Sequence, residues 1–329
     1  MRAVEVKAFG DPEVLTVVES PDPVPGPGEV VIEVAAADVM FLDTLLRSGA
    51  GARFFPVEPP FVPGGAIAGV VGAVGSGVDP AWVGRRVASN TAASGIGGGL
   101  PIGGYAEKAL AREEQLTQVP AEVELTQAVA LVHDGRTALA VFDRAAVQPG
   151  EWVLITAAAG GLGTLLIQLA RAAGARVIAA ARGEKKLALA QRLGAHEVVD
   201  YSEPGWADRV REATGGVQVI LDGAGGPIGV AALAAASPGA RFIGYGNAAG
   251  GFAPIAPETA AAQRVTVVPL FELTAAEVDW TALFERALTE AASGRLEVVI
   301  GHTFPLDHAG AAHAAIAARE TFGRTILTV

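Results

Sequence analysis

A glycine-rich loop near the middle of the chain has the residue types and the spacing that bind a dinucleotide. The apolar run Trp152–Thr156 predicts a strand, and Thr164–Ala173 predicts the helix that follows it. Between them, Ala158, Gly160 and Gly163 stand at the three glycine positions of the dinucleotide fingerprint. A glycine at the second position lets the backbone approach a pyrophosphate, and the helix N-terminus supplies free N–H donors. We therefore predict cofactor contacts from Ala159, Gly160, Gly161, Leu162 and Gly163; the alternative is a packing turn in a domain without cofactor.

The residues after the next predicted strand favour NADP over NAD. An NAD site places an Asp or Glu about 20 residues after the glycines, where it binds the ribose hydroxyls. Here the strand Arg176–Ala180 leads into Ala181, and Arg182, Lys185 and Lys186 follow. Cations at this place would form charge-assisted hydrogen bonds with a 2′-phosphate. The alternative is that the two lysines belong to a solvated helix face.

The elements around this loop predict an α/β fold of two domains. From residue 151 onward, apolar strands alternate with helical stretches of about 10 residues, a pattern typical of βαβ units in a doubly wound parallel sheet. The first 120 residues instead hold short β-branched runs separated by turns such as Pro25–Gly28, which predicts a β-rich domain. The last segments, ending in Gly323–Leu327, are expected to return to that first domain.

Composition excludes several classes of function. The 329 residues include no Cys, so a disulfide framework, an iron–sulfur cluster and a Cys nucleophile are excluded. Five scattered His residues predict no metal cluster. The net charge of −11 disfavours nucleic-acid and anionic membrane partners. Without an apolar run of about 18 residues, we expect no membrane span and a cytoplasmic, unprocessed protein.

Stretches spread over nearly the whole chain together form a specific pattern. They are Phe9–Leu15, Pro25–Val30, Asp43–Gly49, Pro63–Gly64, Ala68–Val71, Gly84–Val87, Gly103–Glu107, Ala158–Gly163, Ala312–His313, Arg319 and Gly323–Arg324. In these stretches the chain resembles the zinc-independent quinone oxidoreductases of the medium-chain dehydrogenase/reductase superfamily.

The resemblance implies a domain organisation, a cofactor and an assembly. It implies a GroES-like substrate domain formed by residues 1–121 and 273–329, a Rossmann domain at residues 122–272, bound NADPH and a homodimer. It also implies roles for five positions. Lys186 and Tyr201 would contact the 2′-phosphate, Gly246 and Asn247 would lie near the cofactor, and Thr137 would lie near the nicotinamide.

Departures from the wider superfamily bear on the chemistry. Zinc alcohol dehydrogenases carry Cys and a Gly-His-Glu segment where this chain reads Val39-Met40-Phe41 and Gly64-Gly65-Ala66. No zinc ligand is left at these positions, so we predict a reaction without metal. Met40 also replaces an Asn that many quinone reductases place beside the substrate. The tyrosine that often follows the Arg-Ser-Gly element is missing, and Phe54 and Phe55 lie nearby instead. An apolar substrate pocket follows, with Met40, Asp43, Phe55 and Thr137 as its predicted lining.

Two residues are candidates for acid–base or orienting roles. His133, next to Asp134 and shortly before Thr137, could donate a proton, and its alternative is a structural histidine. Asp43 could orient the substrate or could cap a helix. The leading hypothesis is an NADPH-dependent reductase that delivers hydride to a quinone or an α,β-unsaturated carbonyl compound. The alternatives are an enoyl or tailoring reductase with one apolar substrate, and a non-catalytic NADPH-binding protein; the physiological substrate stays open.

Overall fold

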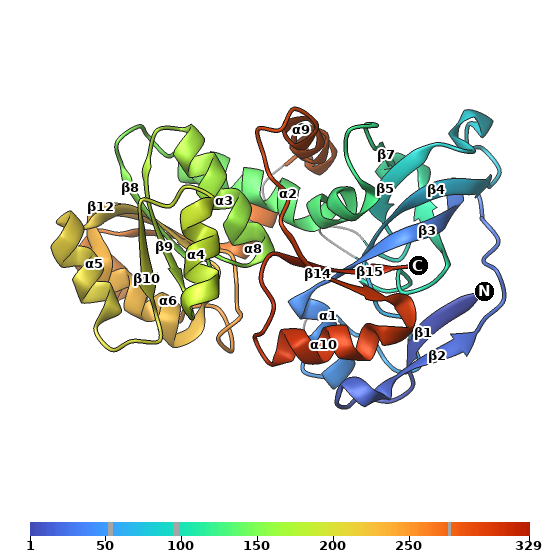
Figure 1. Ribbon diagram of the computed structural model, residues 1–329, viewed down its shortest axis with the longest axis horizontal. Coiled ribbons are helices and arrows are strands. Elements are labelled where there is room, and N and C mark those ends of the chain that lie inside the picture. Colours follow the sequence, from blue (N-terminus) through green and yellow to red (C-terminus); the bar gives the residue numbers. More distant parts are fainter. Residues whose placement is uncertain (52–54, 95–98, 276–277) are drawn as a thin grey trace. The chain divides into compact units, whose positions relative to one another are not determined.

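The computed structural model describes residues 1–51, 55–94, 99–275 and 278–329, which form two compact units. One unit comprises Met1–Gly135 and Trp280–Val329, and the other comprises Arg136–Asp279. Helix α2 (Leu125–Ala145) contributes residues to both units. The predicted domain boundaries after residues 121 and 272 stay a prediction. Figure 1 shows the course of the chain through each unit.

The unit Arg136–Asp279 is a doubly wound parallel sheet, as the sequence predicts. Its strands lie in the order β10-β9-β8-β11-β12-β13, and every neighbouring pair is parallel. The chain runs outward from β8 through β9 to β10 and then returns to the other side of β8 with β11. The topological switch point therefore lies between β8 and β11, which is where such sheets bind ligands. The strands are β8 Trp152–Thr156, β9 Arg176–Ala181, β10 Glu197–Asp200, β11 Val217–Asp222, β12 Ala236–Gly244 and β13 Thr266–Pro269.

Helices cover this sheet on the connections between its strands (Figure 1). The central strands are apolar runs that are buried on both faces; Leu154 and Ile220, for example, have no exposed surface. In a parallel sheet, each crossover connection places a helix against one face, so both faces become covered and the strands are apolar on both sides. The helices are α3 Gly161–Ala172, α4 Glu184–Arg192, α5 Trp206–Thr214, α6 Gly226–Ala232, α7 Pro257–Gln263 and α8 Leu270–Ala275.

The other unit is built on a β-sheet that both ends of the chain complete. Its order is β14-β15-β3-β4-β5-β7, with β6 also paired to β3, and β1 pairs with β2 separately. The C-terminal strand β15 pairs antiparallel with β3, so Ile326 lies opposite Asp38 (Figure 1). The expected return of the last segments is confirmed. The strands are β1 Arg2–Val6, β2 Leu15–Glu19, β3 Glu29–Val39, β4 Ala66–Val74, β5 Arg86–Asn90, β6 Lys108–Arg112, β7 Thr117–Gln118, β14 Ile300–Pro305 and β15 Arg324–Thr328.

Among the described residues, three helices lie wholly within this unit. Helix α1 (Phe41–Ser48) begins directly after β3 and ends at Gly49, whose φ of 83° is readily adopted only by glycine. Helix α9 (Trp280–Ala292) begins the C-terminal part of the unit, and α10 (Ala309–Ala317) packs against α1. Short 3₁₀ turns lie at Pro12–Val14, Pro80–Trp82, Glu113–Gln115 and Leu306–His308, with a fifth in the other unit at Leu233–Ala235.

Candidate functional site

The predicted dinucleotide loop connects β8 to α3 in the expected strand–turn–helix context. A Cβ atom on Gly163 would lie 2.6 Å from the carbonyl oxygen of Ala157 and 2.8 Å from Cα of Ala158, so α3 packs directly on the loop. The strained residue of the turn is Ala157, with φ of 50°, whereas Ala158 is not in the left-handed region. This explains why alanine is accepted at the first fingerprint position.

Gly160 leaves space for a ligand above the first turn of α3. It is exposed, and the nearest atom to a Cβ there would be the Ala157 carbonyl oxygen at 3.3 Å. The first N–H groups of an α-helix have no partner within the helix, and they carry a partial positive charge. A pyrophosphate fits these donors and this open position. The loop residues Ala159, Gly160, Gly161, Leu162 and Gly163 are therefore brought together as predicted, while their contact with a cofactor stays a prediction.

A buried Thr–Asp pair, which the sequence reasoning missed, organises the switch point. The hydroxyl of Thr156, the last residue of β8, donates to Asp222 Oδ1 at 2.5 Å across to the end of β11. Asp222 Oδ1 also accepts from the backbone N–H groups of Ala224 (3.2 Å) and Gly225 (3.1 Å). Burial raises the pKa of Asp222, although these hydrogen bonds oppose the shift. An Asp ending an apolar strand before Gly-Ala-Gly-Gly was the available signal.

Gly246 is held against the same loop. A Cβ on Gly246 would lie 2.0 Å from the carbonyl oxygen of Gly223, and its N–H donates to the Asp222 carbonyl at 3.1 Å. The carbonyl of the adjacent Asn247 accepts from Gly250 N at 3.1 Å. The loops after β11 and β12 thus pack backbone to backbone at the carboxyl edge of the sheet. Gly246 and Asn247 lie at the edge where the resemblance places a cofactor.

The predicted phosphate-binding cations lie where β9 ends and α4 begins. Arg182 is exposed, and Lys186 lies in the first turn of α4, where its N–H donates to the Gly183 carbonyl at 3.2 Å. The N–H of Tyr201, from the end of β10, donates to the Ala181 carbonyl at 3.2 Å. Residues Arg182, Lys186 and Tyr201 therefore come from adjoining ends of two strands and a helix.

A carboxylate that the sequence reasoning did not place also lies at this end. Asp200 Oδ2 accepts from Gly183 N at 2.8 Å, and Oδ1 accepts from Ser202 N at 2.8 Å. Burial pushes the pKa of Asp200 upward, but the bonds from Ser202 and Gly183 and the charge of Arg182 hold it below its usual value. The carboxylate is engaged with the backbone, so it shapes the turn that presents Arg182.

Asp43 is buried within the other unit, where it caps α1. Its Oδ2 accepts from Met40 N at 2.8 Å and from the hydroxyl of Tyr105 at 3.2 Å. The same hydroxyl lies 3.1 Å from His313 Nε2. Asp43, Tyr105 and His313 have no exposed surface, and burial raises the pKa of Asp43 to about 7. The observed role of Asp43 is the capping alternative, and a contact with substrate stays a prediction.

The remaining pocket candidates are distributed over three elements. Met40 is half-buried at the start of α1, and Thr137 is half-buried on α2. Phe55 is half-buried against an apolar cluster that includes Leu46 and Phe61. Phe54 lies outside the described residues. Their arrangement as one pocket stays a prediction.

A second buried cluster surrounds Arg324 and was also missed. Arg324 Nε donates to Asp38 Oδ1 at 2.5 Å, and Nη2 donates to Asp38 Oδ2. Its Nη1 donates to Asp134 at 2.9 and 3.0 Å. His133 Nδ1 lies 3.4 Å from Asp38 Oδ2. Burial raises the pKa of Asp134 to about 6, although the charge of Arg324 partly offsets the shift. Burial also acts to raise the pKa of Asp38, but Arg324 and His133 outweigh it and hold this pKa below its usual value.

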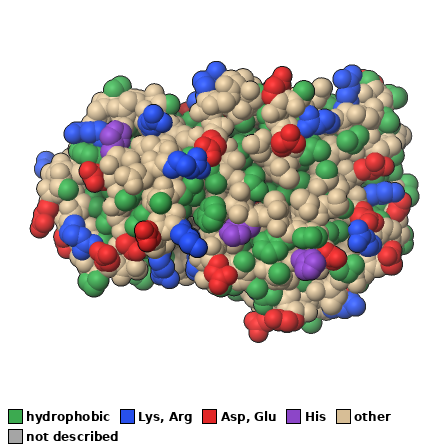
Figure 2. Space-filling model, viewed as in Figure 1, with side chains coloured by type: hydrophobic (Ala, Val, Ile, Leu, Met, Phe, Trp, Pro, Cys, Tyr) green, Lys and Arg blue, Asp and Glu red, His purple; other side chains and the backbone are tan. Residues whose placement is uncertain are grey.

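Three further properties concern metals, membranes and charge. Among the described residues, no three His, Asp or Glu side chains gather as metal ligands would. Within the same part of the chain, no helix combines the length and apolarity needed to cross a membrane. On the face shown in Figure 2, acidic and basic side chains are interspersed.

Comparison with known proteins covers both units. Residues 26–121 match the family model of the alcohol dehydrogenase GroES-like domain, and residues 161–289 match that of the zinc-binding dehydrogenases. A 2-haloacrylate reductase from Burkholderia sp is 34% identical over 315 residues, covering 92% of this chain and 91% of the relative. A quinone oxidoreductase from Homo sapiens is 33% identical over 321 residues, covering 95% and 93%. A mycobacterial protein solved in complex with NADPH is 35% identical with a TM-score of 0.88, and both chains are covered completely.

Proposed function

This chain belongs to the quinone oxidoreductases of the medium-chain dehydrogenase/reductase superfamily, and we propose that it is an NADPH-dependent reductase of a quinone or an α,β-unsaturated carbonyl compound. The observation that carries the proposal is the loop at the end of β8, where Gly160 is open and Gly163 allows α3 to pack closely. NADPH in the related mycobacterial structure supports the choice of cofactor. A homodimer, which the resemblance implies, and a cytoplasmic location, which is the expectation from the sequence, are further parts of the proposal.

Each part of the cofactor has residues suited to hold it. The N–H groups at the start of α3, next to Gly160, would bind the pyrophosphate. Arg182, Lys186 and Tyr201 would bind the 2′-phosphate, because two cations and a phenol can all donate to its oxygens. Thr137 would lie near the nicotinamide. When bound, NADPH supplies the hydride; the protein orients both reactants and excludes water.

A conjugated acceptor suits the residues of this chain. Met40 and Gly65 stand where zinc enzymes carry ligands, so we propose that no metal polarises the substrate oxygen. Hydride addition to a quinone or an enone then needs only hydrogen bonds, because the resulting negative charge is delocalised. The names of the relatives agree with this choice, since quinones and 2-haloacrylate both contain a carbon–carbon double bond conjugated with a carbonyl or carboxylate group.

Cofactor titration tests the proposal directly. We expect the protein to bind NADPH more tightly than NADH, as measured by nicotinamide fluorescence, and to oxidise NADPH in the presence of quinones or enones. Arg182→Ala should weaken NADPH binding about tenfold or more while leaving NADH binding unchanged, because one charge-assisted contact to the 2′-phosphate is lost. The matched control is Arg192→Ala, at the far end of α4. Equal binding of NADPH and NADH would refute the cofactor choice.

One observation favours a second candidate, a reductase dedicated to an apolar enoyl substrate. Phe55 packs on an apolar cluster with Leu46 and Phe61, and Met40 replaces a polar residue common in quinone reductases. Activity on an enoyl thioester with negligible activity on simple quinones would favour this candidate. NADPH binding without turnover of either class would instead support the non-catalytic alternative.

A further inference from the structure

One cation and two carboxylates are enclosed together at the end of β3, with His133 at the edge of the cluster. Arg324 from β15 binds Asp38 through two nitrogens and Asp134 through a third. With both carboxylates ionised, these three groups carry a net charge of −1. A proton on His133, whose Nδ1 lies 3.4 Å from Asp38 Oδ2, makes the cluster neutral. The arrangement therefore favours an imidazolium at this position.

His133 is the most exposed member of the cluster. Asp38 is 1% exposed and Asp134 is 11% exposed, and both are engaged by Arg324. Arg324 is 13% exposed, but a guanidinium does not release its proton in proteins. His133 is 18% exposed, and an imidazole is the side chain best suited to exchange protons near neutral pH. A carboxylate on Nδ1 also fixes the orientation of the ring, as in catalytic His–Asp pairs.

Helix α2 carries His133 and Thr137 on one face. Thr137 follows His133 by four residues in the same helix, so their Cβ atoms lie about 6 Å apart on one face. The proposed function assigns Thr137 to the nicotinamide side of the cofactor, and the present inference rests on that assignment. A group bound beside Thr137 would then lie along the same face of α2 as the imidazole.

We propose that His133, oriented by Asp38, is the proton donor of the reduction. Hydride adds to the β-carbon of the conjugated substrate, and the electron pair of the C=C bond moves toward the carbonyl to form an enolate. The imidazolium then gives its proton to the α-carbon, and the new C–H bond completes the saturated product. Neutral His133 regains a proton from water, so the reaction consumes one NADPH and one proton for each product.

Among the described residues, the charged members of this cluster come from three elements. Asp38, which contacts His133, lies on β3, while Arg324 lies on β15 and Asp134 on α2 itself. Asp43 on α1 acts on the cluster at longer range, since its charge affects Arg324. Asp38 provides a negative charge 3.4 Å from His133 Nδ1, and its neutralisation should make proton loss from His133 easier.

The test uses the full-length protein, NADPH and an enone substituted at the α-carbon. We expect His133→Gln to lower kcat about a hundredfold or more while NADPH binding is unchanged. The wild-type product should have one configuration at the α-carbon. In His133→Gln that selectivity should be lost, because water then delivers the proton, while selectivity at the hydride-accepting carbon is retained. Added imidazole should partly restore the kcat of His133→Ala.

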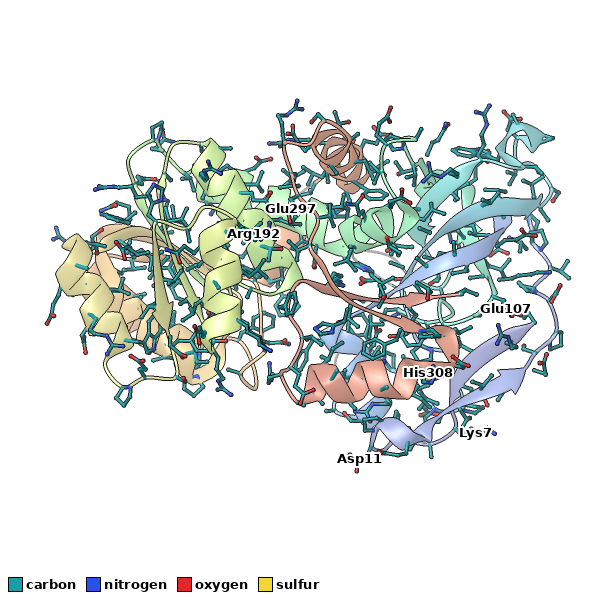
Figure 3. The ribbon with its side chains drawn as sticks, viewed as in Figure 1. Lys7, Asp11, Glu107, Arg192, Glu297 and His308 are labelled. Atoms are coloured by element: carbon teal, nitrogen blue, oxygen red, sulfur yellow. The ribbon has the colours of Figure 1, made fainter. Side chains whose placement is uncertain are left out.

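A second measurement is independent of turnover. In NMR titrations of the protein without cofactor, Asp38→Asn should move the midpoint of the His133 imidazole signal to lower pH. The matched control for the kinetic test is His308→Gln. His308 also pairs with an aspartate, since its Nδ1 lies 3.0 Å from Asp307 Oδ1, but it lies at the surface beside α10 (Figure 3). That variant should keep wild-type kcat and selectivity.

The outcomes separate this inference from the proposed function. Wild-type turnover together with near-normal kcat or intact α-carbon selectivity in His133→Gln would overturn the role of His133 and leave the reductase proposal standing. An unshifted His133 titration in Asp38→Asn would overturn the role of Asp38. An absence of turnover by the wild-type protein on every quinone and enone would overturn the proposed function and this inference with it.

Discussion

Removal of the Arg324 side-chain charge should destabilise the protein in a strongly pH-dependent way. In Arg324→Met, the buried carboxylates of Asp38 and Asp134 lose their cation. Asp38 can then avoid a buried charge by taking up a proton. At pH 7, protonating a carboxyl group with the ordinary value of 3.8 costs about 1.4 × (7 − 3.8), or about 4 kcal/mol. This agrees with the 3–5 kcal/mol, roughly, that is lost when one partner of a buried ion pair is removed.

The pH dependence gives the prediction its sign. In the variant, the pKa of Asp38 in the folded state would be raised above 3.8, so the folded state holds more protons than the unfolded state. Stability of the variant relative to wild type should therefore fall as the pH rises. At pH 5 the same calculation gives about 1.4 × (5 − 3.8), or less than about 2 kcal/mol.

Calorimetry at pH 5 and pH 7 is the appropriate assay. At about 2–4 °C for each kcal/mol, the loss at pH 7 corresponds to a decrease in Tm of about 8–16 °C for the unit containing Arg324. Combining Arg324→Met with Asp38→Asn and Asp134→Asn should restore most of the loss, because none of these three side chains then buries a charge. Arg2→Met, which breaks an exposed pair with Glu107, should leave Tm almost unchanged. A loss below about 1 kcal/mol at pH 7, or a larger loss at pH 5 than at pH 7, would refute the reasoning.

Two further predictions concern Asp43 and the dinucleotide loop. Because burial raises the pKa of Asp43 from 3.8 to about 7, the contribution of Asp43 to wild-type stability should fall as the pH rises from about 4 to 7. In Asp43→Asn, Tm measured across this range should lack that part of the decline. An unchanged slope of Tm against pH would count against a buried acid at this position. Gly163→Ala should weaken NADPH binding at least about tenfold, because its Cβ atom would lie 2.6 Å from the Ala157 carbonyl oxygen and must displace the loop. Gly72→Ala is the matched control, since its nearest neighbour is the flexible Glu33 side chain at 3.1 Å; similar NADPH affinity in both variants would contradict the packing role of Gly163.

Local features of the sequence determined the nucleotide-binding fold and its main loop. The strand Trp152–Thr156 has the same bounds in the structure, and Gly160 and Gly163 occupy the positions that the fingerprint assigns them. This was possible because strand, turn and helix are contiguous, so a few adjacent residues set the backbone path. Successive apolar runs separated by helical stretches likewise imply a parallel sheet, since each crossover needs its own helix.

Only the tertiary structure decided which charged groups meet. Arg324 and Asp38 are 286 residues apart in the chain, and they come together because β15 pairs with β3 in one particular register. Tyr105 and His313 are 208 residues apart, and their contact likewise depends on long-range packing. No local pattern encodes such pairs, because strand register depends on the whole sheet and its buried face. The sequence by itself determined how the chain can hold a dinucleotide, and long-range pairing decided which acids, bases and cations are buried together and how their proton affinities change.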